Sequence, residues 1–216
     1  MKKIAIIGFG RFGRLLAEIL KSAGVIHVVS TSGQSGNFQL ISKEQLIDMD
    51  WIVPAVPISA LRLTLIELVP FIRPGALIFD VSSVKVMPCQ WLIELVPENI
   101  EVVGTHPMFG PDSAKNGLTG LQIVLCPLRQ TEKTLFELKD LFLTKGLKII
   151  ETTPEDHDRQ AANCLSLVHF LGRGLQRLVL SDQEISTMGF ERLLKVNETV
   201  SNDTWQLFLD MQIYNP

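Results

Sequence analysis

Three glycines near the start of the chain have the spacing of a dinucleotide-binding loop. The pattern G-x-G-x-x-G begins at Gly8, follows an apolar run and precedes an amphipathic segment. In such loops the first glycine makes a tight turn, the second lets the backbone approach a pyrophosphate, and the third lets helix and strand pack closely. The next helix presents unpaired N–H groups and its positive dipole end to the phosphates. The residues predicted to line this site are Gly8, Phe9, Gly10, Arg11, Phe12 and Gly13.

The second predicted strand favours the phosphorylated dinucleotide. NAD sites usually carry an acidic residue about 20 positions beyond the glycines, which binds the ribose 2′-hydroxyl. The stretch 19–43 contains no Asp or Glu, and the end of the strand carries Ser30, Thr31 and Ser32. Small hydroxyl groups can hold a 2′-phosphate, and Arg11 would add positive charge. We therefore expect NADP in preference to NAD, the alternative being that these hydroxyl residues form an ordinary polar loop.

A histidine stands in a segment rich in proline and glycine. Residues 103–111 read V-G-T-H-P-M-F-G-P, so we expect a strand to end and a stiff loop to hold His106. Ligands bind at the carboxyl ends of parallel strands in open α/β sheets. Ser83 follows the preceding predicted strand and would lie on the same rim. Its hydroxyl could accept from one ring nitrogen, fix the tautomer and leave the other nitrogen as a general base. From the residues alone, a structural role for His106 is equally open.

The elements that must position these residues alternate as in a parallel sheet with crossover helices. Their apolar runs indicate strands covered on both faces. The predicted strands are Lys3–Gly8, Ile26–Ser30, Trp51–Val53, Ala76–Val81, Glu101–Gly104, Leu121–Cys126 and Lys148–Glu151. The predicted helices are Arg11–Ala23, Ser59–Leu68, Pro88–Leu95 and Thr131–Lys145. The third strand should end by Val53, because Pro54 cannot donate to the ladder; Pro57, just beyond it, is assigned to the cofactor site.

After Glu151 the pattern becomes helical. Residues 153–156 read T-P-E-D, with an N-cap, a proline at the first helical position and acids in the first turn. One long helix should run from there to about Leu180. A second helical stretch should run from about Phe190 to Tyr214, with a break near Asn202.

These elements define a Rossmann-type, doubly wound α/β fold with a mainly parallel sheet. We expect a dinucleotide-binding domain over residues 1–151 and a helical segment for substrate binding and dimerisation over residues 152–216. A helical pair of this size has little core of its own, so it should pack on the first domain or on a second subunit. A homodimer formed through these helices is the expected assembly.

Composition limits the remaining possibilities. With 216 residues, 46% of them hydrophobic and 20% charged, the chain is expected to be a globular protein of one domain plus a smaller addition. The net charge of −3 argues against a broad surface for nucleic acid or anionic membranes. No stretch approaches the ~20 apolar residues of a membrane span. The three cysteines lack metal-site spacing and should be buried free thiols, so we expect no metal and a cytoplasmic location.

Taken together, these motifs resemble the prephenate/arogenate dehydrogenase family of tyrosine biosynthesis. The resemblance rests on the glycine pattern, on D-V-x-S-V-K at 80–85 and on T-H-P-M-F-G-P at 105–111. Four further stretches are most similar to plant-type arogenate dehydrogenases, namely 112–117, 155–158, 167–173 and the ending from 198 to 215. The resemblance spans essentially the whole chain.

The resemblance implies a reaction in which a cyclohexadienol is oxidised at its 4-hydroxyl by hydride transfer to a nicotinamide, with loss of CO2. It implies that His106 is the base and that Ser83 orients it. The substrate-binding residues carried over are Thr105, Lys115, His169, Arg173 and Asp203. Asp203 aligns with an acid of arogenate-preferring relatives, where it would attract the ammonium group that arogenate has and prephenate lacks. Lys195 stands where bacterial prephenate enzymes carry an arginine, and a lysine cannot reproduce the bidentate fork.

Three other functions remain to be weighed. A prephenate dehydrogenase would use the same base. A β-hydroxyacid or imine reductase would share the nucleotide fold, but it relies on a lysine of the second domain and leaves the 105–111 motif unexplained. A non-catalytic dinucleotide-binding regulatory protein would have no use for Ser83 and His106. His157, in the first turn of a predicted helix beside acidic residues, is interpreted as structural.

Overall fold

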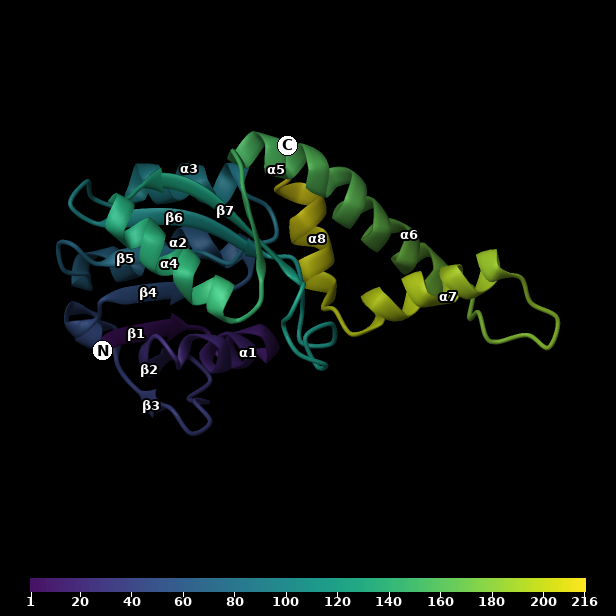
Figure 1. Ribbon diagram of the computed structural model, residues 1–216, viewed down its shortest axis with the longest axis horizontal. Coiled ribbons are helices and arrows are strands. Elements are labelled where there is room, and N and C mark those ends of the chain that lie inside the picture. Colours follow the sequence, from purple (N-terminus) through teal and green to yellow (C-terminus); the bar gives the residue numbers. More distant parts are fainter.

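The protein is built on one eight-stranded sheet, seen in a computed structural model that describes residues 1–216 except for the side chain at position 199. The strand order is β3-β2-β1-β4-β5-β6-β7-β8 (Figure 1). The strands are β1 (Lys2–Ile7), β2 (Gly24–Val29), β3 (Gln39–Leu40), β4 (Trp51–Pro54), β5 (Leu77–Phe79), β6 (Glu101–Pro107), β7 (Gln122–Arg129) and β8 (Lys148–Glu151). All neighbours pair in parallel except β6 and β7. The predicted Rossmann-type, mainly parallel fold is confirmed.

Helices cover both faces of the sheet, as the apolar strands require. They are α1 (Arg11–Leu20), α2 (Ile58–Leu68), α3 (Val86–Leu95) and α4 (Glu132–Thr144), with short 3-10 turns at Lys43–Asp48 and Val69–Phe71. Side chains alternate along a strand, so Ile4 and Ile6 of β1 pack in one core with α1 and α4. Ala5 and Ile7 pack in the other core with α2 and α3. Every β1 residue from 4 to 7 is therefore buried.

Strands β4, β6 and β7 end later than the sequence predicts. β6 continues to Pro107 because the antiparallel strand β7 keeps pairing with it, with Pro107 opposite Ile123. His106 therefore lies in a strand, opposite Val124, and the prediction that it lies in a loop is wrong. β4 includes Pro54 because Ala55, the next residue, donates to the Ile7 carbonyl at 2.8 Å and continues the pairing.

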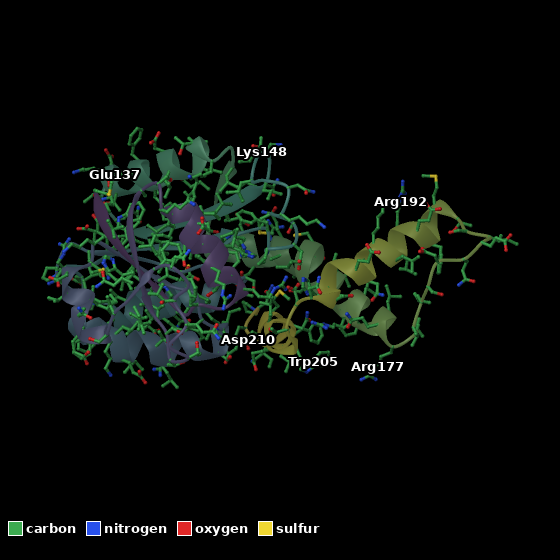
Figure 2. The ribbon with its side chains drawn as sticks, turned by 90° about the horizontal axis from the view of Figure 1, so that it is seen from below. Glu137, Lys148, Arg177, Arg192, Trp205 and Asp210 are labelled. Atoms are coloured by element: carbon green, nitrogen blue, oxygen red, sulfur yellow. The ribbon has the colours of Figure 1, made fainter. Side chains whose placement is uncertain are left out.

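The C-terminal part is helical, with a break where the sequence predicts one. Its helices are α5 (Pro154–Ala161), a π turn (Ala162–Ser166), α6 (Leu167–Gln176), α7 (Met188–Ser201) and α8 (Trp205–Ile213). The first helical run ends at Gln176 rather than near Leu180. Figure 1 shows α6 and α7 side by side, extending away from the sheet, while α8 lies back toward it. We call α6, α7 and the loop between them the arm. In Figure 2, Arg177 and Arg192 lie far out on the arm, whereas Trp205 and Asp210 lie at its base.

Composition predicts buried free thiols and no membrane span, and the structure bears on both. All three cysteines are free, but only Cys89 and Cys126 are buried. Cys164, on the π turn, is exposed, because the outer side of this helical run faces solvent. Among the described residues, no helix is both long and apolar enough to span a bilayer.

Two buried carboxylates fasten the C-terminal helices to the sheet domain. A helix leaves its first N–H groups without partners, and neither α2 nor α3 has a capping side chain of its own. Asp210 of α8 accepts from the backbone N–H and the hydroxyl of Ser59 in α2, both at 3.1 Å. Asp158 of α5 accepts from the N–H groups of Lys85 and Val86 at the start of α3, at 2.6 and 2.8 Å. Each carboxylate is also favoured by the positive end of the helix dipole.

The arm depends on a glycine at the crossing of α6 and α7. A Cβ atom placed on Gly172 would lie 2.5 Å from Cγ2 of Val200, which is fully buried. A Cβ atom on Gly174, two residues later in the same helix, would meet nothing within 4 Å. The two glycines therefore differ in packing although they share a helix.

We expect Gly172→Ala to destabilise the protein by about 1–3 kcal/mol, the usual cost of overpacking. Gly174→Ala is the matched control, and it should be neutral or stabilising by about 0.5–1 kcal/mol because alanine loses less backbone entropy in a helix. Thermal unfolding followed by circular dichroism compares the two. Equal unfolding temperatures for the two variants would contradict the close α6–α7 packing.

Candidate active site

The loop between β1 and α1 has the geometry that a dinucleotide requires. Gly8 has φ of +95°, which side chains rarely tolerate. A Cβ atom on Gly13 would lie 2.3 Å from the carbonyl oxygen of Gly8, so the close approach of helix and strand requires glycine there. A Cβ atom on Gly10 would meet nothing within 4 Å. The backbone at Gly10 thus borders open space at the start of α1, where a pyrophosphate fits.

The loop after β2 carries hydroxyl groups and an arginine that the sequence analysis did not select. The hydroxyl oxygens of Ser30 and Ser32 are 2.9 Å apart. Arg14 donates to the side chain of Gln34 at 2.5 Å, and its guanidinium lies 5.5 Å from the centre of the Phe9 ring. Arg14 stands one helical turn after Arg11, on the side of α1 that faces this loop. In the sequence, only the position of Arg14 directly after the last glycine of the G-x-G-x-x-G pattern could have pointed to a role at this loop.

Arg11 points elsewhere. Its guanidinium donates to the carboxylate of Asp112 and to the backbone carbonyl of Asn202, each at 2.8 Å. It therefore joins the glycine loop to the loop after β6 and to the turn between α7 and α8. The expectation that Arg11 supplies charge beside Ser30–Ser32 is wrong in this structure, because both of its contacts lie on other loops.

A fully buried ion pair lies at the ends of β5 and β6. The ammonium of Lys85 lies 2.5 Å from the Asp80 carboxylate and donates to the Thr105 carbonyl at 2.6 Å. Asp80 also accepts from the N–H groups of Ser82 and Thr105, at 3.0 and 3.1 Å. The hydroxyl of Thr105 donates to the Asp80 carbonyl. All of these polar groups have partners inside the protein and Thr105 is fully buried, so its substrate-binding role stays a prediction.

His106 meets a second histidine rather than a serine. Its Nδ1 lies 2.8 Å from Nε2 of His157 on α5, and Nδ1 of His157 lies 2.7 Å from the Asp158 carboxylate. The Ser83 hydroxyl has no hydrogen-bond partner, so the expectation that it orients His106 is wrong here. Burial, the neighbouring His157 and the Lys85 charge lower the pKa of His106 well below its ordinary value. His106 is therefore neutral at pH 7 and can accept a proton.

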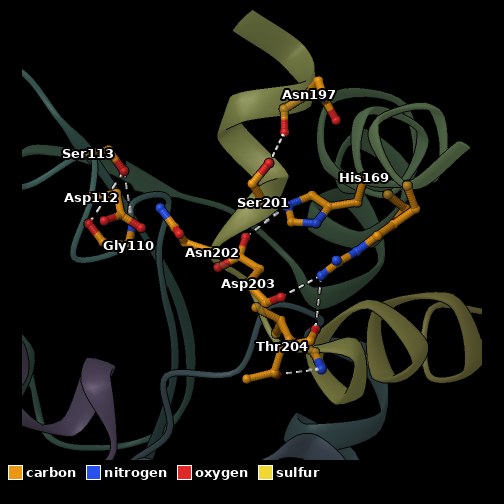
Figure 3. Close-up of polar contacts among 12 residues, drawn as sticks. Gly110, Asp112, Ser113, His169, Asn197, Ser201, Asn202, Asp203 and Thr204 are labelled. Carbon is orange, nitrogen blue, oxygen red and sulfur yellow. Dashed lines mark hydrogen bonds and ion pairs between the residues drawn. The ribbon is translucent and has the colours of Figure 1, made fainter. Parts of the chain in front are cut away.

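Three of the predicted substrate residues, His169, Arg173 and Asp203, meet at the turn between α7 and α8. Figure 3 shows His169 and Asp203 there. Nε2 of His169 lies 3.7 Å from the Asp203 carboxylate. Arg173 donates to the backbone carbonyls of Asp203 and Thr204, at 2.5 and 3.3 Å. Its guanidinium also lies 5.5 Å from the centre of the Trp205 ring. Arg173 therefore supports the turn that presents Asp203.

Burial governs the charges in this group. It lowers the pKa of His169 and raises the pKa of Asp203, although each shift opposes their mutual attraction. Since both shifts favour the neutral forms, we take desolvation to outweigh the attraction across 3.7 Å. His169 is thus neutral at pH 7, and the carboxyl of Asp203 has no cationic side chain within ion-pair distance among the described residues. A bound cationic group would find that position open.

The remaining predicted residues are more exposed. Lys115 lies in the β6–β7 loop, Pro57 caps the start of α2, and Thr31 lies in the loop after β2; all three are exposed. Phe12 is half-buried and packs against the core that contains Phe9. Lys195 lies exposed on α7.

Several buried polar atoms at these positions have no partner. They include the hydroxyl of Ser83, Nδ1 of His169 and Nε of Arg173. Buried polar atoms in native proteins are nearly always hydrogen-bonded, so each unpaired atom needs an explanation. A polar ligand in this region would supply the missing partners. The residues present therefore fit a site for a dinucleotide and a small polar substrate.

The fold and the glycine loop define a dinucleotide-binding protein with a helical extension. A family profile for the nucleotide-binding domain of prephenate dehydrogenase matches residues 34–151, and one for a TYRAAT1-like C-terminal domain matches residues 174–216. The chain belongs to the prephenate/arogenate dehydrogenase family, which confirms the resemblance.

Relatives and solved structures agree with this assignment. Two chloroplastic arogenate dehydrogenases of Arabidopsis thaliana are 30% and 31% identical over 99% of this chain, which spans 36% and 64% of their lengths. A structure of prephenate dehydrogenase from A. aeolicus, in complex with hydroxyphenyl propionate and NAD+, has a TM-score of 0.76. It is 20% identical and covers all of this chain, which spans 83% of it. At that identity the likeness supports the fold alone.

Proposed function

We propose that this protein catalyses the NADP-dependent oxidative decarboxylation of arogenate to tyrosine. His106 would take the proton of the 4-hydroxyl through Nε2 while a hydride leaves C4, the carbon that bears this hydroxyl. Bound NADP would supply the hydride acceptor. Breaking the bond to the ring carboxylate then releases CO2 and leaves its electron pair in the ring, which becomes aromatic, and the phenolate oxygen takes up a proton to give the tyrosine hydroxyl. Family membership, together with the fit of the site, supports this proposal.

One observation carries it: a buried, neutral histidine lies at the same carboxyl edge of the sheet as the glycine loop. β1 and β6 run in the same direction in the sheet, so Gly8 and His106 lie toward the same edge. Phe9 and Phe109, which follow these two residues, pack in one hydrophobic core. A base near the nicotinamide end of a dinucleotide is what hydride removal from an alcohol needs.

The assignment of arogenate rests on Asp203. Its carboxyl is half-buried beside a neutral His169 and is held by a turn that Arg173 supports. A substrate ammonium would gain a charge-assisted bond there, whereas the keto group of prephenate would not. We therefore retain Asp203 and His169 as substrate-binding residues, with Lys115 as a candidate for the substrate carboxylate.

The preference for NADP rests on the loop after β2. Ser30 and Ser32 supply hydroxyls, Arg14 is bonded to Gln34 of the same loop, and no acid stands in the stretch 19–43 to repel a 2′-phosphate. Arg14 takes the place that the sequence analysis assigned to Arg11. Ser83, whose buried hydroxyl has no partner, is retained as a residue of the proposed site.

The remaining expectations form part of the same proposal. Residues 1–151 would bind the dinucleotide, residues 152–216 would complete the substrate side, and a homodimer would form through the C-terminal helices. A cytoplasmic location stays a prediction, and the two plant relatives are chloroplastic by name. Prephenate oxidation and a non-catalytic regulatory role remain as alternatives, which the following assays separate.

We expect NADP reduction when arogenate is supplied, followed as absorbance of the reduced cofactor. His106→Asn should lower kcat at least ~100-fold, because general base catalysis contributes about that much. NADP affinity, measured by calorimetry, should stay nearly the same. The wild-type kcat/KM should fall as pH drops through the pKa of His106, and this limb should lie below the ordinary histidine value of 6.5. No turnover with arogenate or prephenate, in a protein that binds NADP, would favour the regulatory alternative.

Asp203→Asn should shift preference toward prephenate. Loss of the charged partner should lower kcat/KM for arogenate about 10- to 100-fold, since a hydrogen bond to a charged group is worth ~1.5–3 kcal/mol. Asp182→Asn removes one acidic charge from an exposed position on the arm and serves as the matched control. If the ratio of the two substrates is the same in Asp203→Asn and in the control, Asp203 does not select the substrate.

Arg14→Gln should lower the ratio of kcat/KM with NADP to that with NAD roughly tenfold, the value of one charge-assisted contact to the 2′-phosphate. Arg11→Gln should change both cofactors alike, because Arg11 contacts Asp112 and Asn202 instead. Initial rates with the two cofactors measure the ratio. A larger effect in Arg11→Gln would return the phosphate-binding role to Arg11.

A further inference from the structure

Two histidines and an aspartate form a buried chain that leads away from the proposed catalytic base. His106 and His157 are linked at 2.8 Å through Nδ1 and Nε2, and His157 is linked to the Asp158 carboxylate at 2.7 Å. The exposed fractions of the three residues are 6%, 4% and 1%. His157 and Asp158 are neighbours on α5, whereas His106 belongs to β6, so the chain crosses between the two parts of the molecule.

The partners of Asp158 decide which way each hydrogen bond runs. Its two carboxyl oxygens accept from the N–H groups of Lys85 and Val86, at 2.6 and 2.8 Å, as those of a carboxylate do. A carboxylate only accepts, so Nδ1 of His157 must carry the proton it donates. In the arrangement where that is the only proton on the His157 ring, Nε2 of His157 is an acceptor and Nδ1–H of His106 donates to it. The remaining lone pair of His106 is on Nε2.

We propose that His157 and Asp158 are positioning residues that hold neutral His106 as the Nδ1–H tautomer and so make Nε2 the proton acceptor. This inference rests on the proposed function and names the groups that orient its base. When Nε2 takes the substrate proton, the Nδ1 proton can pass to Nε2 of His157. That step breaks the N–H bond of His106, returns it to a neutral ring and leaves an imidazolium beside the Asp158 carboxylate.

The surrounding charges fit this direction of proton movement. Lys85, at the start of α3, disfavours a positive charge on His106, but its own charge is paired with Asp80, which follows β5. Asp158, on α5, is the acidic group that contacts His157 directly. The chain therefore moves positive charge from a residue near Lys85 to one held against a carboxylate. The serine that the sequence suggested has no hydrogen-bond partner and does not compete for Nδ1.

The tautomer can be measured without turnover. Two-bond 1H–15N spectra of the 15N-labelled protein at pH 8 distinguish the two neutral forms of each imidazole. The chain has only 4 histidines, so His106 is assigned by the signals lost in His106→Asn. We expect the Nδ1–H form for His106 in the wild type. An Nε2–H form would overturn the inference whether or not the protein is active.

Two variants of His157 separate orientation from proton acceptance. His157→Phe removes the acceptor, so His106 should shift toward the Nε2–H form that free imidazole favours, and kcat should fall ~100-fold with KM for NADP little changed. His157→Gln keeps an oxygen acceptor for Nδ1–H but cannot take up a proton. It should therefore retain the tautomer and recover part of the turnover. Asp158→Asn should also shift His106 toward the Nε2–H form and lower kcat, but less than His157→Phe does.

Thr153→Ala is the matched control, because it removes the N-cap of α5 without touching the chain of hydrogen bonds. Turnover in His157→Phe equal to that of the control, or an unchanged His106 tautomer, would overturn the inference. Should His157→Phe fail to fold, the wild-type tautomer and the His157→Gln kinetics still decide it. A wild type that oxidises neither arogenate nor prephenate would refute the proposed function, while the spectra alone would decide whether the hydrogen-bond chain orients His106.

Discussion

The buried pair of Lys85 and Asp80 is the constraint around which the site is arranged. Both side chains are fully inaccessible to solvent, so each charge has lost its hydration and depends on protein partners. The Thr105 carbonyl and the N–H groups of Ser82 and Thr105 complete those partnerships. The pair thereby ties the end of β5, the start of α3 and the end of β6 at one point. Removing one partner of such a pair typically costs about 3–5 kcal/mol, because the other charge stays buried. The position of His106, one residue beyond Thr105, is held by this arrangement.

The same corner receives the C-terminal helices. The Asp158 carboxylate caps the start of α3 by accepting from the N–H groups of Lys85 and Val86. The Asp210 carboxylate caps the start of α2 through the N–H of Ser59. Both caps use N–H groups that a helix cannot satisfy by itself, so the C-terminal segment completes the sheet domain rather than merely resting on it. This attachment brings His157 to His106. Arg11 makes the corresponding link on the other side, from the glycine loop to the turn that carries Asp203. Arg11 thus contacts both the turn that carries Asp203 and the loop that follows β6.

Desolvation sets the protonation of both histidines proposed to act on the substrate. Burial is the largest cause of the lowered pKa at His106 and at His169. Neutral imidazoles at neutral pH suit a reaction that begins with removal of a proton from an alcohol. Burial raises the pKa of Asp203, next to His169, because it disfavours the charged carboxylate. A cationic substrate group would reverse that effect by restoring a partner to the carboxylate.

The sequence by itself determined the fold class, the dinucleotide loop, the family and the break before α8. These depend on local patterns, namely glycine spacing, apolar strands and capping residues, which act within a few positions of one another. Only the tertiary structure decided the length of β6, because its antiparallel partner pairs with it from β7. It also decided the partners of Arg11, Thr105 and Ser83, and it replaced Ser83 by His157 as the neighbour of His106. Those outcomes depend on contacts between residues 20 to 191 positions apart, which no local pattern encodes. Burial then sets the charges, because hydration is lost only when distant segments pack together.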